Sequence, residues 1–356
     1  MMSDAQRCGS ESGFTLVELM IAAMLTLVVM SVAFSTFENA AELNEAVMQI
    51  ADQSQNLRAG TNLLVRDLLQ AGRNLPTGGI AIPSGANAED IYRPGPAGEV
   101  RTFDNVDQTT ISAITSGGAL GPAVAGEATD MITILLDDPF LEALSVDPST
   151  AAGDGPTLSV DGASMDVGDR TDWLEGDPEN GVAAIAEGDL FYFLSPTGTT
   201  LQTVTRVVSP NIYFDADDPF NLNQRGAAAG SITQILGATM TVRRVLMYTY
   251  WVEEEADGIP RLMRALNFFE GTALAGAVED LTIRYDLVDG TTNPTDVENL
   301  PFELNDLTYT ATQIRKVNLQ IGVRSENVSA RTGDYVRNHV STVVSIRNLA
   351  FVDRYQ

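Results

Sequence analysis

The clearest pattern in the chain is an almost unbroken apolar run from residue 14 to residue 37. A run of ~20 residues or a little more is long enough to cross a bilayer as a helix. Glu18 is the only charged residue inside it. Beyond residue 37, apolar and small residues recur at spacings of four and three, the period of an amphipathic helix. The members of this stripe are Leu43, Val47, Ile50, Ser54, Leu57, Thr61, Leu64 and Leu68.

We therefore predict one continuous helix from about Phe14 to about Gln70. Gly72 and Pro76 follow, and residues of these types commonly end a helix. No proline lies between residues 14 and 75, so we expect a stiff helix. Its first half should lie in a membrane, and its second half should pack under a globular head. A seam between two coiled-coil partners is the alternative for the stripe.

The rest of the chain carries strand patterns. Segments rich in β-forming residues and bounded by Asp, Pro or Gly lie at 132–136, 190–194 and 203–208. In 281–287 and 317–323, apolar residues occupy every second position and so share one face. Segments 241–252 and 261–266 predict a hairpin with an acidic turn at 253–258. Because such alternation suits an antiparallel sheet with one solvated face, we predict an α+β fold in which four or more strands pack on the second half of the helix.

These patterns divide the chain into five regions. Residues 1–13 form a polar leader, 14–37 the transmembrane half of the long helix, and 38–75 its amphipathic half. Residues 76–235 begin with a stretch rich in Gly, Pro, Ala and Ser, which predicts a loop-rich β elaboration. Residues 236–356 predict the antiparallel sheet of the head.

The order of the first two regions predicts how the chain is processed. A secretory signal places its apolar core before a small-residue cleavage site, whereas here Gly13 precedes the apolar run. Cleavage between Gly13 and Phe14 would keep the anchor and create an α-amino group on Phe14. A carboxylate near the end of a membrane helix costs roughly 2–3 kcal/mol, so Glu18 needs a partner. The amine of a neighbouring Phe14 would supply one and set subunit register. An ordinary signal-anchor helix with an incidental glutamate is the alternative.

Residues 13–22 read Gly-Phe-Thr-Leu-Val-Glu-Leu-Met-Ile-Ala, which resembles the processing motif of type IV prepilins and of type II secretion pseudopilins. The resemblance implies cleavage after Gly13 by a prepilin peptidase and N-methylation of Phe14. It also implies that Glu18 is the glutamate that sets subunit register. The chain departs from the family in two ways. Its leader carries one arginine against two acidic residues, although such leaders are usually basic, and the anchor lacks the proline common in major pilins.

Two further segments carry a finer resemblance. Residues 63–73 resemble the helix end of PilW-like minor pilins, and residues 342–348 resemble the closing strand of that group and of pseudopilin J. The resemblance implies that other major and minor pilins and an inner-membrane assembly platform are partners. It also implies a single-pass inner-membrane protein with its head in the periplasm. After assembly, the subunit would lie in an extracellular pilus or a periplasmic pseudopilus.

Composition narrows the function further. The formal net charge is −27, so we expect no nucleic-acid partner. Cys8 is the only cysteine and lies in the leader, so the mature protein would have no disulfide. His339 is the only histidine, which nearly excludes zinc sites and histidine-dependent triads. Lys316, the only lysine, lies in a predicted strand, so no phosphate-binding loop with a lysine is present.

The acidic loop at 154–180 is the stronger of two candidates for a cofactor site, and the other is the acidic loop at 215–218. Calcium takes several oxygen ligands on a turning backbone. Asp154, Asp161, Asp166 and Asp169 could supply them, although their spacing is not that of an EF-hand. A solvated acidic loop is the alternative. We expect no other cofactor.

Two runs of carboxylates and two tryptophans complete the candidates. Carboxylates at 137–138 and 253–255 are of the kind that glycosidases use, but charges at strand ends are usually solvated, and we expect no catalysis. We expect Trp251 to lie in the core. Trp173 lies in the acidic loop, where it is either a binding anchor or the cover of a small core.

Three hypotheses follow for the function. The first is a non-catalytic minor pilin that takes part in assembly at initiation or at the filament tip, because the head is bulkier than a repeating shaft subunit needs. The second is a pseudopilin J-like subunit of a type II secretion pseudopilus. The third is a tip adhesin that binds a surface through residues 76–235. An enzyme on a membrane tether is disfavoured.

Overall fold

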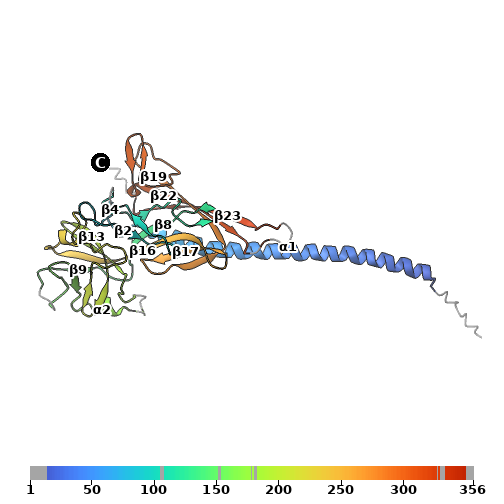
Figure 1. Ribbon diagram of the computed structural model, residues 1–356, viewed down its shortest axis with the longest axis horizontal. Helices are drawn as coiled ribbons and strands as arrows, with labels where there is room; N and C mark the ends of the chain where they lie inside the picture. The colour runs from blue at the N-terminus through green and yellow to red at the C-terminus, as the bar shows by residue number, and fades with distance from the viewer. Residues whose placement is uncertain are drawn as a thin grey trace, which may run out of the picture. The chain divides into compact units, whose positions relative to one another are not determined.

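The computed structural model describes residues 14–104, 108–150, 154–177, 179, 183–326, 328 and 333–349. The chain divides into two compact units, Met1–Asp52 with Asn327–Val336 and Gln53–Glu326 with Arg337–Gln356. Helix α1 (Leu16–Gln70) is continuous, as predicted, and is drawn in blue in Figure 1. A mainly antiparallel β region follows it, which confirms the α+β prediction.

The first unit contains the apolar part of α1. Leu16–Glu45 is long and apolar enough to cross a membrane, and its most apolar window is not buried within the protein. The exposed side chains continue into the predicted stripe, where Leu43, Val47 and Ile50 are 60%, 63% and 44% exposed. An apolar surface of this extent needs lipid or another protein around it.

In the second unit the stripe becomes buried at Leu57. Leu57, Leu64 and Leu68 are at most 3% exposed and belong to one core with residues of the β region, including Tyr250 and Leu262. The predicted packing of the amphipathic half under the head therefore holds only from Leu57 onward. The spacing is the same before and after Leu57, so the pattern alone does not predict where burial begins.

The helix ends where the sequence predicts. The last helical residue is Gln70. Gly72 has a φ of +73°, a left-handed conformation that glycine adopts without strain and that commonly follows a helix. Its amide donates to the carbonyl of Leu135 at 3.0 Å, so the turn is tied directly to the sheet. A Cβ at this position would lie 3.2 Å from side-chain carbons of Ala113 and Leu349.

The central strand of the main sheet is β16 (Met240–Glu254). One of its edges pairs with β12 and β17, and the other pairs with β8 and β9, all antiparallel. β13 pairs with β12, β18 with β17, and β5 with β8. The strands around β16 are β5 (Ile114–Thr115), β8 (Ile132–Asp137), β9 (Leu144–Val146), β12 (Leu190–Ser195), β13 (Gly198–Thr203), β17 (Pro260–Leu266) and β18 (Thr272–Gly276).

Most predicted strands of this sheet are confirmed. The hairpin of β16 and β17, β8 and β12 lie where the sequence places them. The predicted strand at 203–208 is wrong, because β13 ends at Thr203 and a separate strand begins at Arg206. Since β8, β9, β12 and β13 precede residue 235 and β16 follows it, one sheet takes strands from both sides of the expected division at that residue.

A three-stranded sheet has the order β19-β22-β23, from β19 (Val278–Leu287), β22 (Ile314–Arg324) and β23 (Arg337–Ser345). The alternation predicted for 281–287 and 317–323 is confirmed, because the apolar positions of both segments are at most 2% exposed. They share one core with α1 and with residues of β8, β16 and β17.

The segment between β9 and β16 builds a smaller sheet of its own, in the order β10-β11-β15-β14. Its strands are β10 (Thr157–Leu158), β11 (Ser164–Asp166), β14 (Arg206–Val208) and β15 (Asn211–Tyr213), with helix α2 (Thr171–Glu175) and the 3-10 turn η1 (Ile232–Gln234) beside them in sequence. A separate core that includes Trp173, Phe191 and Phe214 lies here. Figure 1 shows α2 and β9 in this part of the molecule.

Short two-stranded pairs account for the remaining strands of the described chain. Each has strands of two or three residues, in keeping with the loop-rich region expected after residue 76. The pairs are β1 (Ile80–Ala81) with β4 (Thr110–Ile111), β2 (Ile91–Arg93) with β3 (Arg101–Phe103), β6 (Ala123–Val124) with β7 (Glu127–Ala128), and β20 (Phe302–Leu304) with β21 (Leu307–Tyr309). A second 3-10 turn, η2 (Ala311–Gln313), leads into β22.

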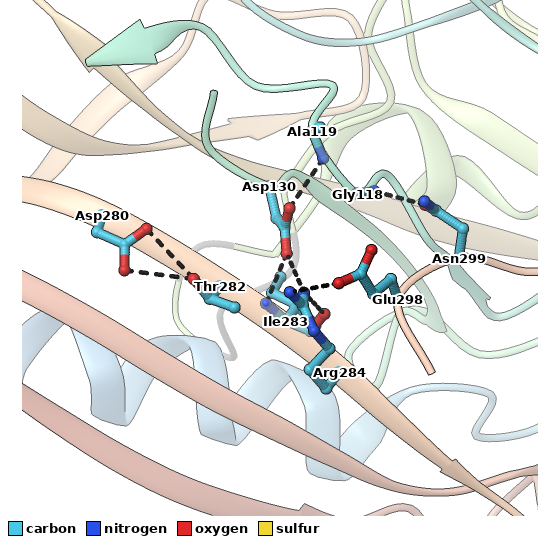
Figure 2. Close-up of polar contacts among 9 residues, drawn as sticks. All are labelled: Gly118, Ala119, Asp130, Asp280, Thr282, Ile283, Arg284, Glu298 and Asn299. Carbon is cyan, nitrogen blue, oxygen red and sulfur yellow. Dashed lines mark hydrogen bonds and ion pairs between the residues drawn. The ribbon is translucent and has the colours of Figure 1, made fainter. Parts of the chain in front are cut away.

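Asp130, just before β8, joins the main sheet region to β19 (Figure 2). Its carboxylate accepts hydrogen bonds from the amides of Ala119 at 2.8 Å and Ile283 at 2.7 Å, and pairs with Arg284 at 3.2 Å. Arg284 also pairs with Glu298 at 2.9 Å. Asp130 is 8% exposed, so these donors replace the water that burial removes.

Candidate functional site

The predicted processing site lies at the start of α1. Gly13 is outside the described residues, and Phe14 is 85% exposed. Glu18 and Thr15 form a reciprocal cap on the first turn of the helix. The amide and the hydroxyl of Thr15 each donate to Glu18 Oε2 at 3.0 Å, and the Glu18 amide donates to Thr15 Oγ1 at 3.3 Å. This is the arrangement of a capping box, which satisfies helix amides that would otherwise lack partners.

The cap changes what the sequence alone suggests about Glu18. The carboxylate already has donors within its own chain, so it does not depend on a second subunit for hydrogen bonds. Those donors are neutral, however, and they leave its negative charge in place. A cation beside Glu18, such as the α-amino group of a processed Phe14, would therefore still be favourable, most of all in a surrounding of low polarity.

A second cluster fastens α1 to the head, and it lies at Asp67. This side chain is 3% exposed. Its Oδ2 accepts a hydrogen bond from the Tyr250 hydroxyl at 2.6 Å and two from Arg264, from Nε at 3.1 Å and Nη2 at 2.7 Å. Arg66 reaches Oδ1 at 3.3 Å from the surface. Burial raises the pKa of Tyr250 strongly, with a further contribution from the charge of Asp67, so this phenol stays a donor.

The guanidinium of Arg264 is held from two sides. It pairs with Asp67, and it lies over the ring of Tyr248 with 3.6 Å between the guanidinium carbon and the ring centroid. This contact is a cation–π interaction. Sequence reasoning singled out the segment 63–73 but not its partners on β16 and β17. The signal available was a charge inside a helix face that otherwise packs on the sheet.

The carboxylates at 137–138 correct an expectation. They were expected to be solvated, but Asp137 and Asp138 are only 3% and 4% exposed. Asp138 forms an ion pair with the buried Arg244, and Asp137 pairs with Arg243 at 3.1 Å. Arg244 also lies 3.6 Å from Asp189. Both acids are thus neutralised by cations about a hundred residues away in sequence, which a strand-end pattern does not reveal.

The four calcium candidates do not gather around one point. Asp161 accepts hydrogen bonds from Ser159 and Ala163, and Asp166 accepts one from the amide of Gly168, so each caps its own turn. Asp154 and Asp169 are exposed. Within the described residues, there is no group of three or more His, Cys, Asp or Glu that could hold a metal ion. Calcium binding stays a prediction without geometric support.

The structure decides between the two readings of Trp173. Its side chain is fully buried and stacks on Phe191, with ring centroids 5.3 Å apart and 10° between the planes. It therefore covers a core and is not an exposed anchor. Trp251 is 2% exposed, as expected for a core residue, and its indole nitrogen donates to Glu253 at 2.8 Å.

The comparison with known families agrees with the resemblance seen at the start of the chain. Residues 9–34 match the family model of the prokaryotic N-terminal methylation motif. This motif is typical of type IV pilin-like proteins, and it implies processing by a prepilin peptidase and assembly with other pilins. Together with the apolar helix, it is consistent with a single-pass, membrane-anchored protein. No curated protein and no solved structure matches the chain.

Proposed function

We propose that the chain is a non-catalytic minor pilin that takes part in type IV pilus assembly, at initiation or at the filament tip. One observation carries the proposal. The methylation motif at 9–34 runs directly into a helix whose apolar surface is left exposed through Ile50. A helix of this kind is held by lipid before assembly and by other apolar helices afterwards.

The contrast along α1 supports this role. Leu43, Val47 and Ile50 are exposed, whereas Leu57 and Leu64, which continue the same stripe, are buried against the subunit's own sheet. The exposed part therefore provides a surface for neighbouring helices. The buried part and the Asp67 cluster fix the end of the helix, from Leu57 onward, to the head.

Glu18 sets register in this proposal, and its cap suggests how to separate two contributions. Glu18→Gln keeps an N3 side chain that can complete the capping box but removes the charge. Glu18→Ala removes both. Glu38→Gln is the matched control, because Glu38 is an exposed acid on the same helix and lies outside the motif.

The test is a count of surface filaments by electron microscopy in a strain that lacks the gene, complemented with each variant. We expect the wild-type and Glu38→Gln copies to restore filaments, and Glu18→Gln and Glu18→Ala to fail. Mass spectrometry of the purified wild-type protein should show an N-terminus at methylated Phe14. Filament numbers that do not change in the deletion strain would refute a role in pilus assembly.

The same strains separate the pilus from a secretion pseudopilus. If filaments persist and export of secreted proteins through the outer membrane is lost, the subunit belongs to a type II secretion system. If filaments persist and only attachment falls, the tip adhesin hypothesis replaces the assembly role. Deleting residues 140–235 is not a clean test of adhesion, because it would remove β12 and β13 from the main sheet.

A further inference from the structure

A cavity of about 340 Å³ lies on the head, and the residues that line it all come after α1 in the sequence. It is lined by the loop at 94–97, by the end of β16 and by the turn between β17 and β18. The residues that give it its character are Trp251, Glu253, Phe268, Phe269, Glu270 and Gly271. Its size falls in the range of small-ligand sites, which is roughly 300–1,000 Å³.

Three aromatic rings line this cavity, and two of them are open to solvent. Phe268 is 40% exposed and Phe269 is 45% exposed. Phe268 is held edge-on against Phe220, with 5.0 Å between ring centroids and 80° between planes. A fixed ring that stays accessible can receive a ligand at little entropic cost.

The third ring, Trp251, is fixed by its neighbours. Its indole nitrogen donates to Glu253 Oε2 at 2.8 Å. The main chain of Gly271 lies so close to the six-membered ring that a Cβ there would be 2.6 and 2.8 Å from two ring carbons. Any larger residue at this position would displace the ring, so the glycine keeps the indole where it lines the cavity.

The charged residues that line the cavity are all negative. Glu253, Glu255 and Glu270 line it, and none of its lining residues is an arginine or lysine in the chain as described. Glu255 is neutralised by Arg261 at 2.6 Å. The other two are not, since Glu253 receives only the neutral indole N–H, and Glu270 has neither a hydrogen bond nor an ion pair among the described residues. Two uncompensated carboxylates therefore lie beside three aromatic rings.

We propose that this cavity binds an organic cation, an alkylammonium group with an apolar body. The negative face of an aromatic ring attracts a cation within about 6 Å, and the two uncompensated carboxylates add charge attraction. A neutral apolar ligand would bury the carboxylates without pairing them, which is costly. A bare divalent metal ion needs several oxygen ligands, and the rings supply none. The lysine side chain of another protein and a choline-type group share the required chemistry, and the proposal does not depend on the assembly role.

The chain itself is a poor source of the occupant. Its only lysine, Lys316, lies on β22 with its amine 3.9 Å from Asp286. A second copy therefore offers no free lysine side chain as the occupant.

The test uses the full-length protein in an uncharged detergent. Calorimetric titration is performed with choline, with N-acetyl-lysine methylamide, and with 3,3-dimethylbutanol, a neutral compound of the shape of choline. We expect a cation to bind in the millimolar range and the neutral compound to bind at least about tenfold more weakly. Which of the two cations binds more tightly distinguishes a protein side chain from a choline-type group.

Three variants assign the binding to this cavity. Glu270→Gln and Phe269→Leu should each weaken cation binding by about fivefold or more. Glu254→Gln should change it by less than about twofold, because Glu254 is an exposed acid on the same hairpin but does not line the cavity. Unchanged thermal unfolding shows that each variant is folded. Equal binding of choline and its neutral counterpart, no binding up to about 50 mM, or equal weakening by Glu254→Gln would overturn the proposal.

Discussion

Replacing Asp67 by alanine should loosen the attachment of the helix to the head. The change leaves the fully buried Tyr250 hydroxyl without its acceptor at 2.6 Å and leaves the Arg264 guanidinium, whose side chain is 19% exposed, without its carboxylate. Removing one partner of a buried charge pair costs about 3–5 kcal/mol in the free energy of unfolding. We expect the lower end, about 3 kcal/mol, because Arg264 keeps its contact with the Tyr248 ring.

Two further variants show how much of this free-energy cost comes from each contact of Asp67. Tyr250→Phe removes a single hydrogen bond to a charged acceptor and should cost about 1.5–3 kcal/mol. Arg66→Ala removes the other cation of Asp67, but that side chain is 59% exposed, so its loss should cost less than about 1 kcal/mol. The double variant Asp67→Ala with Tyr250→Phe should cost less than the sum of the two single changes, because both remove the same bond.

The measurement is urea unfolding of the full-length protein in an uncharged detergent, followed by near-ultraviolet circular dichroism. This signal reports aromatic packing in the head and is insensitive to the apolar helix in the micelle. A cost for Asp67→Ala that does not exceed that of Arg66→Ala would refute the reasoning. It would mean that apolar packing alone, at Leu57, Leu64 and Leu68, holds the helix on the sheet.

Other predictions concern the core, a turn and pH. Leu64→Ala should cost about 2–5 kcal/mol of stability, and Leu43→Ala, on the exposed part of the stripe, less than about 0.5 kcal/mol, as measured by urea unfolding. Gly230→Ala should yield little folded protein on purification, because its Cβ would lie 2.0 Å from the Ile82 carbonyl oxygen at a φ of +70°. Burial raises the pKa of Asp189, so at a pH between the ordinary aspartate pKa and the raised one the native carboxyl holds a proton that the unfolded one has released. Stability should fall as pH rises from the ordinary aspartate value through the raised pKa, and urea midpoints for Asp189→Asn should show a smaller fall.

Local patterns predicted much of the fold. The end of α1 at Gln70 follows from Gly72, and the strands β19 and β22 follow from alternation over seven or more residues. Each of these signals lies within one short segment and needs no knowledge of a partner. The strand at 203–208 failed for the same reason, since nothing local shows that the chain leaves β13 at Thr203 to begin a new hairpin.

The polar residues of the head were harder to predict. Asp137 and Asp138 look like solvated ends of a strand, yet they are buried because β8 pairs with β16 and brings Arg243 and Arg244 beside them. Asp67 likewise finds its partners 183 and 197 residues away. Burial of a charge depends on which strands become neighbours, and that information is spread over the whole chain.

The stripe along α1 shows how one sequence pattern can serve two contacts. From Leu57 to Leu68 the stripe packs against strands of the same chain. Asp67 adds hydrogen bonds that require Tyr250 on β16 and Arg264 on β17 to lie beside it. Through Leu43, Val47 and Ile50 the same spacing leaves apolar side chains exposed. Under the proposed role, helices of neighbouring subunits cover these side chains once the subunit has moved from the membrane into the filament. A substitution such as Val47→Asp should then leave the free energy of unfolding of the head unchanged and reduce the number of filaments. Leu64→Ala should lower both the free energy of unfolding and the number of filaments.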